Sequence, residues 1–165
     1  MGGVPNMARA MAHSPAALEG FLALAAALGG GVLPAATQER TALAVSEANG
    51  CSYCLSAHTH VAREVAGLPQ EEIFAARRGT SADPKEAALL RLAVAVLRSR
   101  GRVGEEGIEE ARRAGITDPE IVEVIANVAR NILTNYLNEA LAVDIDIEWP
   151  PVTPEEGGER HSAAA

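Results

Sequence analysis

Apolar residues recur at the three-to-four-residue spacing of helices along most of the chain, and strict alternation appears only near the C-terminus. Ser14 followed by Pro15 is typical of a helix start, and the glycines from Gly29 onward end the apolar run behind it. Asn49 and Gly50 are typical of a left-handed helix end. The pattern predicts an all-α fold with helices over residues 16–28, 34–49, 51–66, 69–78, 83–99, 105–114 and 118–143.

A weak internal repeat runs through these predicted helices. LAVSEANG (43–50) aligns with LAVAVLRS (92–99), and AGLPQEEI (66–73) aligns with AGITDPEI (114–121). Both cysteines of the chain belong to the first copy, so the packing unit that is repeated does not need them.

The C-terminal end has a different character. DIDIEWPPV (144–152) alternates between polar and apolar residues and then meets two prolines, which predicts a short extended arm lying on a neighbouring subunit or on the chain's own helices. Residues 153–165 carry no apolar residues able to form a core. We therefore expect one helical domain over residues 1–152 and a disordered tail over 153–165.

Composition and charge narrow the class of protein. The chain has 165 residues, a size typical of one domain, and a net charge of -8 without a cluster of Lys and Arg. Nucleic acid and anionic membrane surfaces are therefore unfavourable partners. The longest apolar run (21–36) contains glycines and a proline and follows Glu19, which is atypical of a membrane span or a secretion signal. We expect a cytoplasmic protein without a membrane partner.

Two cysteines and a histidine share one predicted helix face. Cys51, Cys54 and His58 follow i, i+3, i+7 spacing, which indicates a redox pair, half of a metal site, or buried small side chains. His60 points away from this face, and no second C-x-x-C or H-x-x-H completes a zinc site, so no metal is predicted. A C-x-x-C pair closes too small a loop to be a useful structural staple, which favours redox chemistry.

The position of each cysteine suggests how the pair would work. Cys51 at the start of a helix meets free backbone N–H groups, which favours it as the more acidic and more exposed thiol. Burial would reverse this order, and the sequence does not decide which cysteine attacks. The preceding helix is predicted to run antiparallel, which places Glu39 at the depth of His58 and Glu47 level with Cys51. A carboxylate beside the imidazole would fix its tautomer and favour its charged form.

The spacing of these residues matches a known family. Glu39, eleven residues, C-x-x-C, three residues and a histidine, together with VPNMARAMAHSPAALEGFLALAAALGGG (4–31), LTNYLN (133–138) and DIDIEWP (144–150), form the pattern. It resembles the AhpD-like alkylhydroperoxidases of the carboxymuconolactone decarboxylase superfamily, in their peroxidase-related branch. The resemblance covers about residues 4–150.

The resemblance implies an all-α, AhpD-like fold, assembled as a trimer or hexamer, and a thiol peroxidase without a cofactor. Cys51 and Cys54 would reduce a hydroperoxide and form a disulfide that an external dithiol reduces, with His58 as the proton relay and Glu39 orienting it. Tyr53 stands where some members have a histidine between the cysteines.

Two other functions remain open on the sequence. One is a non-catalytic, redox-responsive oligomer with a structural or sensing disulfide. The other is the decarboxylase or lactone chemistry of the wider superfamily, whose branch lacks the C-x-x-C pair. Four polar residues of the last predicted helix are expected to line the pocket or to contact another subunit: Asn131, Asn135, Tyr136 and Asn138.

Overall fold

The computed structural model describes residues 3–146 and 148–155, and all regular secondary structure within them is helical. The all-α prediction is confirmed. The six-residue helix α1 was not predicted because it is too short to show a clear hydrophobic period. The helices are α1 (Asn6–Met11), α2 (Pro15–Gly29), α3 (Ala35–Asn49), α4 (Ser52–Glu64), α5 (Gln70–Arg77), α6 (Pro84–Ser99), α7 (Gly104–Arg113) and α8 (Asp118–Ala140).

Side-chain caps define several helix starts. The Ser14 hydroxyl accepts a hydrogen bond from the backbone N–H of Ala17 at the start of α2. Asp83 accepts two backbone N–H groups at the start of α6. Thr117 and Glu120 form a reciprocal capping box at the start of α8. These contacts satisfy donors that a helix cannot pair internally, which is why the element boundaries follow the sequence signals closely.

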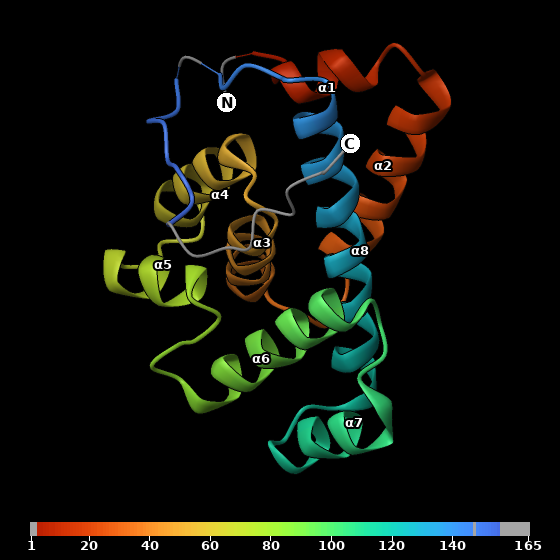
Figure 1. Cartoon of the computed structure of the whole chain (residues 1–165), viewed down its shortest axis with the longest axis vertical. Helices are drawn as coiled ribbons and strands as arrows, with labels where there is room; N and C mark the ends of the chain where they lie inside the picture. The colour runs from red at the N-terminus through yellow and green to blue at the C-terminus, as the bar shows by residue number, and fades with distance from the viewer. Residues whose placement is uncertain (1–2, 147, 156–165) are drawn as a thin grey trace, which may run out of the picture.

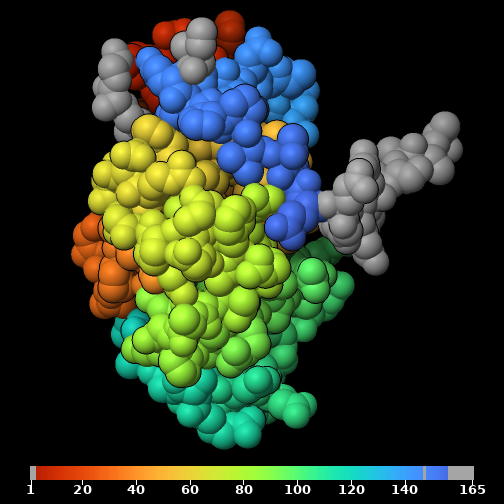
Figure 2. Space-filling view, turned by 90° about the vertical axis from the view of Figure 1, so that its left-hand side faces the viewer, coloured from red at the N-terminus to blue at the C-terminus, as the bar shows by residue number. Residues whose placement is uncertain are grey.

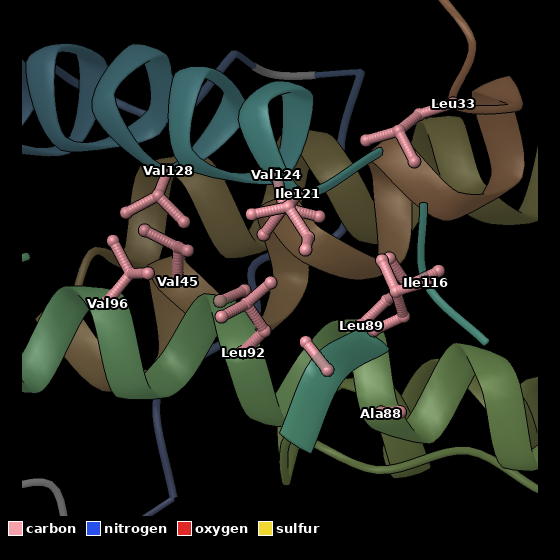
Figure 3. Packing of buried hydrophobic residues seen from close by; sticks show 12 residues of the cluster. Leu33, Val45, Ala88, Leu89, Leu92, Val96, Ile116, Ile121, Val124 and Val128 are labelled. Atoms are coloured by element: carbon pink, nitrogen blue, oxygen red, sulfur yellow. The ribbon is translucent and has the colours of Figure 1, made fainter. Parts of the chain in front are cut away.

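Helix α3 lies in the middle of the molecule and packs against α4, α5, α6 and α8 (Figure 1). Its Val45 side chain joins residues of α6 and α8 in the larger apolar core, which Figure 3 shows from close by. Its Leu43 belongs to a second core shared with α4 and α5. Because α3 is held from several sides, side chains on its surface have fixed neighbours on α4 and α8.

Helices α3 and α6 end in the same way, one position out of register with the sequence repeat, which pairs Gly50 with Ser99. Gly50 after α3 and Arg100 after α6 both adopt left-handed conformations, with φ of 71° and 55°. In each case the next N–H reaches back into the helix, from Cys51 to Ser46 O (3.0 Å) and from Gly101 to Val96 O (2.8 Å). The two helical units therefore share a turn geometry, and only the first places a cysteine directly after it.

The C-terminal arm, residues 144–155 apart from position 147, lies on the chain's own helices. Its blue segment covers α4 and reaches α5 in Figure 2. Ser56 Oγ accepts the backbone N–H of Val152 (2.8 Å), and Arg77 donates to the carbonyl of Thr153 (2.9 Å). The chain thus stays in contact with the helices as far as Glu155, whose N–H donates to Glu47. The rest of the predicted tail, 156–165, lies outside the described residues.

None of the helices in the described ranges is both long and apolar enough to cross a bilayer.

Candidate active site

The two cysteines lie where the chain turns from α3 into α4. Gly50 makes the left-handed turn, and Cys51 follows as the N-cap of α4 with an extended backbone. Cys51 Sγ accepts a hydrogen bond from the backbone N–H of Cys54 (3.4 Å). Both thiols are reduced and buried, with 0% of Cys51 and 2% of Cys54 exposed. The turn therefore holds the two sulfurs one helical turn apart in a dry environment.

Glu39 and His58 meet as the predicted antiparallel arrangement requires. His58 Nδ1 lies 2.8 Å from Glu39 Oε2, so an Nδ1–H donates to the carboxylate and the second ring nitrogen remains available for a proton. Burial alone would lower the pKa of His58, but the charge and hydrogen bond of Glu39, with a contribution from Cys54, outweigh it and raise this pKa. The pair therefore favours a charged imidazolium beside the thiols.

The polar groups around the sulfurs favour a thiolate on Cys54. The Cys51 thiol donates to Cys54, and this hydrogen bond, the positive charge of His58 and the amides of Asn138 and Asn135 lower the pKa of Cys54 although burial raises it. Asn138 Nδ2 lies 3.2 Å from Cys54 Sγ. The same hydrogen bond, together with burial, raises the pKa of Cys51. These contacts therefore favour the thiolate on Cys54 over the thiolate on Cys51.

The directions in which the surroundings shift the two pKa values are the reverse of what the position of Cys51 at a helix start favours, and neither thiol is exposed. The position of Cys51 at the start of α4 was inferred correctly, and its sulfur does accept a backbone N–H. A side chain distant in sequence reverses the consequence. Both cysteines lie in the cluster that includes Tyr53 and Trp149, but the amide of Asn138 reaches Cys54.

Tyr53 anchors the two ends of the chain over this site. Its hydroxyl donates to Asp146 Oδ2 (2.6 Å) and accepts the backbone N–H of Met7 (3.1 Å). Its ring meets that of Trp149 edge to face, with the centroids 5.5 Å apart. Tyr53 is only 4% exposed, and its hydroxyl makes a structural contact with both ends of the chain.

Other candidate residues divide into those at the site and those away from it. Glu47 forms an ion pair with Arg77 (2.7 Å). Asn135 is buried and donates to Ser46 Oγ (3.2 Å), while it accepts from Asn49 (2.8 Å). This chain of amides ties α8 to the end of α3. Asn131 donates to a backbone carbonyl of its own helix, and the Tyr136 side chain is 61% exposed.

Asn138 and Asn135 are the site residues whose role the sequence left undecided. The sequence feature that pointed to them was the accumulation of amides on an otherwise apolar helix, since buried amides need partners.

Within the described ranges, no three His, Cys, Asp or Glu side chains gather as metal ligands would. The arrangement combines a stabilised thiolate, a neighbouring thiol and a charged acid. It can attack an electrophile through Cys54 and then close a disulfide with Cys51.

Comparison with known proteins indicates a family and a fold. Residues 15–93, which contain Glu39, both cysteines and His58, match the model of the Carboxymuconolactone decarboxylase family. A peroxidase-related protein from Silicibacter sp. TM1040 has the same fold, with a TM-score of 0.81, 29% identity, and coverage of 90% of this chain and 80% of its own. The match over residues 15–93 and the fold shared with this structure support the assignment of the chain to the carboxymuconolactone decarboxylase superfamily. Its fold within that superfamily is AhpD-like.

Two further structures extend the comparison of this AhpD-like chain. An alkylhydroperoxidase AhpD core protein from Ralstonia eutropha JMP134, also described as peroxidase-related, shows a TM-score of 0.80 at 28% identity, covering 89% of this chain and 80% of its own. A cysteine-to-alanine variant of the debrominase Bmp8, in complex with 2,3,4-tribromopyrrole, shows 0.76 at 25% identity, covering 88% and 79%. No functionally curated protein matches the sequence.

Proposed function

We propose that this AhpD-like protein is a thiol-dependent hydroperoxidase that works through Cys54 and Cys51 without metal, haem or flavin. The observation that carries the proposal is the set of donors around Cys54 Sγ, which favours its thiolate, beside a histidine that Glu39 holds in its charged form. A thiolate with a nearby acid is the pairing that peroxide reduction needs, because the leaving oxygen must be protonated.

The first step oxidises Cys54. Its thiolate attacks one oxygen of the hydroperoxide, an S–O bond forms and the O–O bond breaks. The departing alkoxide takes a proton, which His58 supplies from its imidazolium. Cys54 is left as a sulfenic acid, and the peroxide leaves as an alcohol. The ion pair with Glu39 keeps the imidazole oriented while its charge changes.

The second step uses Cys51. Its sulfur attacks the sulfenic sulfur of Cys54, the disulfide forms, and the Cys51 proton leaves with the hydroxyl as water. An external dithiol then reduces this disulfide and becomes a disulfide itself. Cys51 is suited to the resolving role because its raised pKa keeps its proton until this step.

Steady-state turnover tests this proposal. The purified protein is expected to oxidise dihydrolipoamide only when a hydroperoxide is present. Cys51→Ser and Cys54→Ser should each abolish turnover. Glu39→Gln and His58→Ala should each lower the rate about tenfold or more, equivalent to about 1.4 kcal/mol of barrier. Retained turnover in either cysteine variant would refute the proposed cycle.

A second candidate function is supported by the burial of both thiols. With 0% and 2% of their surfaces exposed, the cysteines could serve a redox-responsive protein whose disulfide forms slowly and is not turned over. The same dithiol assay separates the two functions. A redox-responsive protein would form the disulfide once with peroxide, but the rate of dithiol oxidation would not exceed the uncatalysed rate.

We further propose that the protein is a homo-oligomer, a trimer or hexamer, and that the exposed apolar face of α8 is a subunit contact. This α8 stripe is made of Val122, Ile125, Ala129, Leu133 and Tyr136, whose spacing of three and four residues places them on one face. Exposure of Val122 (64%), Ile125 (40%), Leu133 (45%) and Tyr136 (61%) leaves a continuous apolar surface. Val65, 75% exposed and outside the stripe, provides a control position.

A further inference from the structure

A second pocket lies away from the thiols, between α3, α5 and α6; Figure 1 shows α3 at the centre, α5 to its left and α6 below it. Its volume is about 550 Å³, which is within the range of pockets that hold small molecules. The lining residues include neither cysteine, nor His58, nor Glu39. The pocket is therefore a separate feature of the molecule.

Four arginines line this pocket. Arg77 and Arg78 come from the end of α5, and Arg91 and Arg98 come from α6. Arg91 and Arg98 are seven residues apart, which places both on one face of α6. The lining has two acidic residues, Glu47 and Glu155, so four positive and two negative groups leave a local charge of +2. The whole chain carries -8, so this concentration of positive charge opposes the overall composition.

One of the four arginines has its partners within the protein. Arg77 is buried, donates to Glu47 Oε2 (2.7 Å) and also donates to the carbonyl of Thr153 (2.9 Å). For the other three, Arg78, Arg91 and Arg98, no carboxylate among residues 3–146 and 148–155 lies within ion-pair distance. Guanidinium groups of like charge around one pocket repel each other, and a bound anion removes that repulsion.

The remaining lining is small and apolar. Four such side chains lie between the arginines: Ala44, Ala48, Val94 and Ala95. A ligand that fills the pocket therefore needs a compact anionic group for the guanidinium groups and an apolar portion for this floor.

We propose that the pocket binds an organic phosphate, with the phosphate group on Arg78, Arg91 and Arg98 and the apolar portion on the alanine and valine floor. Guanidinium groups match phosphate oxygens with paired, charge-assisted hydrogen bonds. A phosphate monoester also concentrates close to two negative charges on one group, which balances the local charge of +2. A dicarboxylate spreads its charge over two separate groups and fits a single cluster of arginines less well.

Calorimetric titration tests the site without any use of peroxide or dithiol, so its outcome is independent of the proposed thiol chemistry. Phenyl phosphate is the main probe, with inorganic phosphate, succinate and benzyl alcohol as comparisons at low ionic strength. The variant is Arg91→Gln with Arg98→Gln. The matched control is Arg102→Gln with Arg113→Gln, two exposed arginines outside the pocket. Circular dichroism confirms that both variants keep the helical fold.

We expect saturable binding of one phenyl phosphate per chain, weaker binding of inorganic phosphate and succinate, and no binding of benzyl alcohol. The pocket variant should bind at least about tenfold more weakly, since each lost charge-assisted hydrogen bond is worth at least that factor. The control should bind as the wild type does. Equal affinity in the pocket variant, or absence of saturable binding to the wild type, would overturn the site. Equal or tighter binding of succinate or of inorganic phosphate would overturn its assignment to an organic phosphate.

Discussion

The hydrogen bond from Asn138 to Cys54 gives the sharpest prediction about the site. Asn138 Nδ2 lies 3.2 Å from Cys54 Sγ, and both residues are 2% exposed. Replacing Asn138 with Leu removes the donor and keeps a side chain of similar size. A hydrogen bond to a charged group contributes about 1.5–3 kcal/mol. At about 1.4 kcal/mol per pKa unit, the Asn138→Leu variant should raise the pKa of Cys54 by about 1–2 units.

A second asparagine of α8 provides the control. Asn127 is buried, and its amide donates to a backbone carbonyl of its own helix (2.9 Å), away from the thiols. Among the described residues, Oδ1 of Asn127 and Oδ1 of Asn138 both lack a hydrogen-bond partner. The two changes to Leu thus remove similarly placed polar groups, and Asn127→Leu reports the general effect of such a change on the helix.

The assay follows thiolate formation by its ultraviolet absorbance while the pH is varied, and iodoacetamide alkylation provides a second reading. The wild type and Asn127→Leu should form the first thiolate below the usual thiol range, because the folded site lowers the pKa of Cys54. Asn138→Leu should form it at higher pH. If the two variants titrate together, Asn138 does not stabilise the thiolate, and the account of Cys54 acidity is wrong.

Three other changes test separate parts of the structure. Because Glu39 raises the pKa of His58, the stabilisation from this pair is present below about pH 6.5 and is lost as the pH rises through the folded pKa of His58. Glu39→Gln should therefore lower the free energy of unfolding, measured in urea, by on the order of 1 kcal/mol more at about pH 5.5 than at about pH 9. Equal losses at both pH values would contradict this coupling. Tyr53→Phe removes the hydrogen bond to Asp146 of the arm and the one from the Met7 N–H of α1, and should cost about 1–3 kcal/mol, with greater acrylamide quenching of Trp149, the chain's single tryptophan. Unchanged quenching would show that the arm is held by other contacts. Leu133→Lys should reduce the mass measured by light scattering to that of one chain, and an unchanged mass would exclude the α8 stripe as the contact.

The parts of the site that depend on local geometry could be predicted from the sequence. The 3.6-residue period places Cys51, Cys54 and His58 along α4, and the Asn49-Gly50 turn makes α3 and α4 neighbours. Glu39 at the depth of His58 follows from that arrangement, and the structure places the two side chains 2.8 Å apart. Local period and turn chemistry are sufficient here because few residues separate the partners.

The parts that depend on distant segments could not be predicted. Asn138 is 84 residues from Cys54, and Tyr53 is 93 residues from Asp146. No local pattern says which asparagine of α8 faces a sulfur, or that the C-terminal arm returns to its own α4. The order of acidity of the two cysteines has the same origin. A helix start favours an acidic thiol at Cys51, but the amide of Asn138, from a distant part of the chain, reaches Cys54 instead.

The central claim is that Cys54 attacks the hydroperoxide and Cys51 resolves the product. The most direct measurement treats the reduced Cys51→Ser variant with hydrogen peroxide in the presence of dimedone, which captures sulfenic acids, and locates the adduct by peptide mass spectrometry. Cys54→Ser is treated in parallel. The account predicts a dimedone adduct on Cys54 in the first variant and almost none on Cys51 in the second. An adduct on Cys51 in Cys54→Ser, with none on Cys54 in Cys51→Ser, would contradict it.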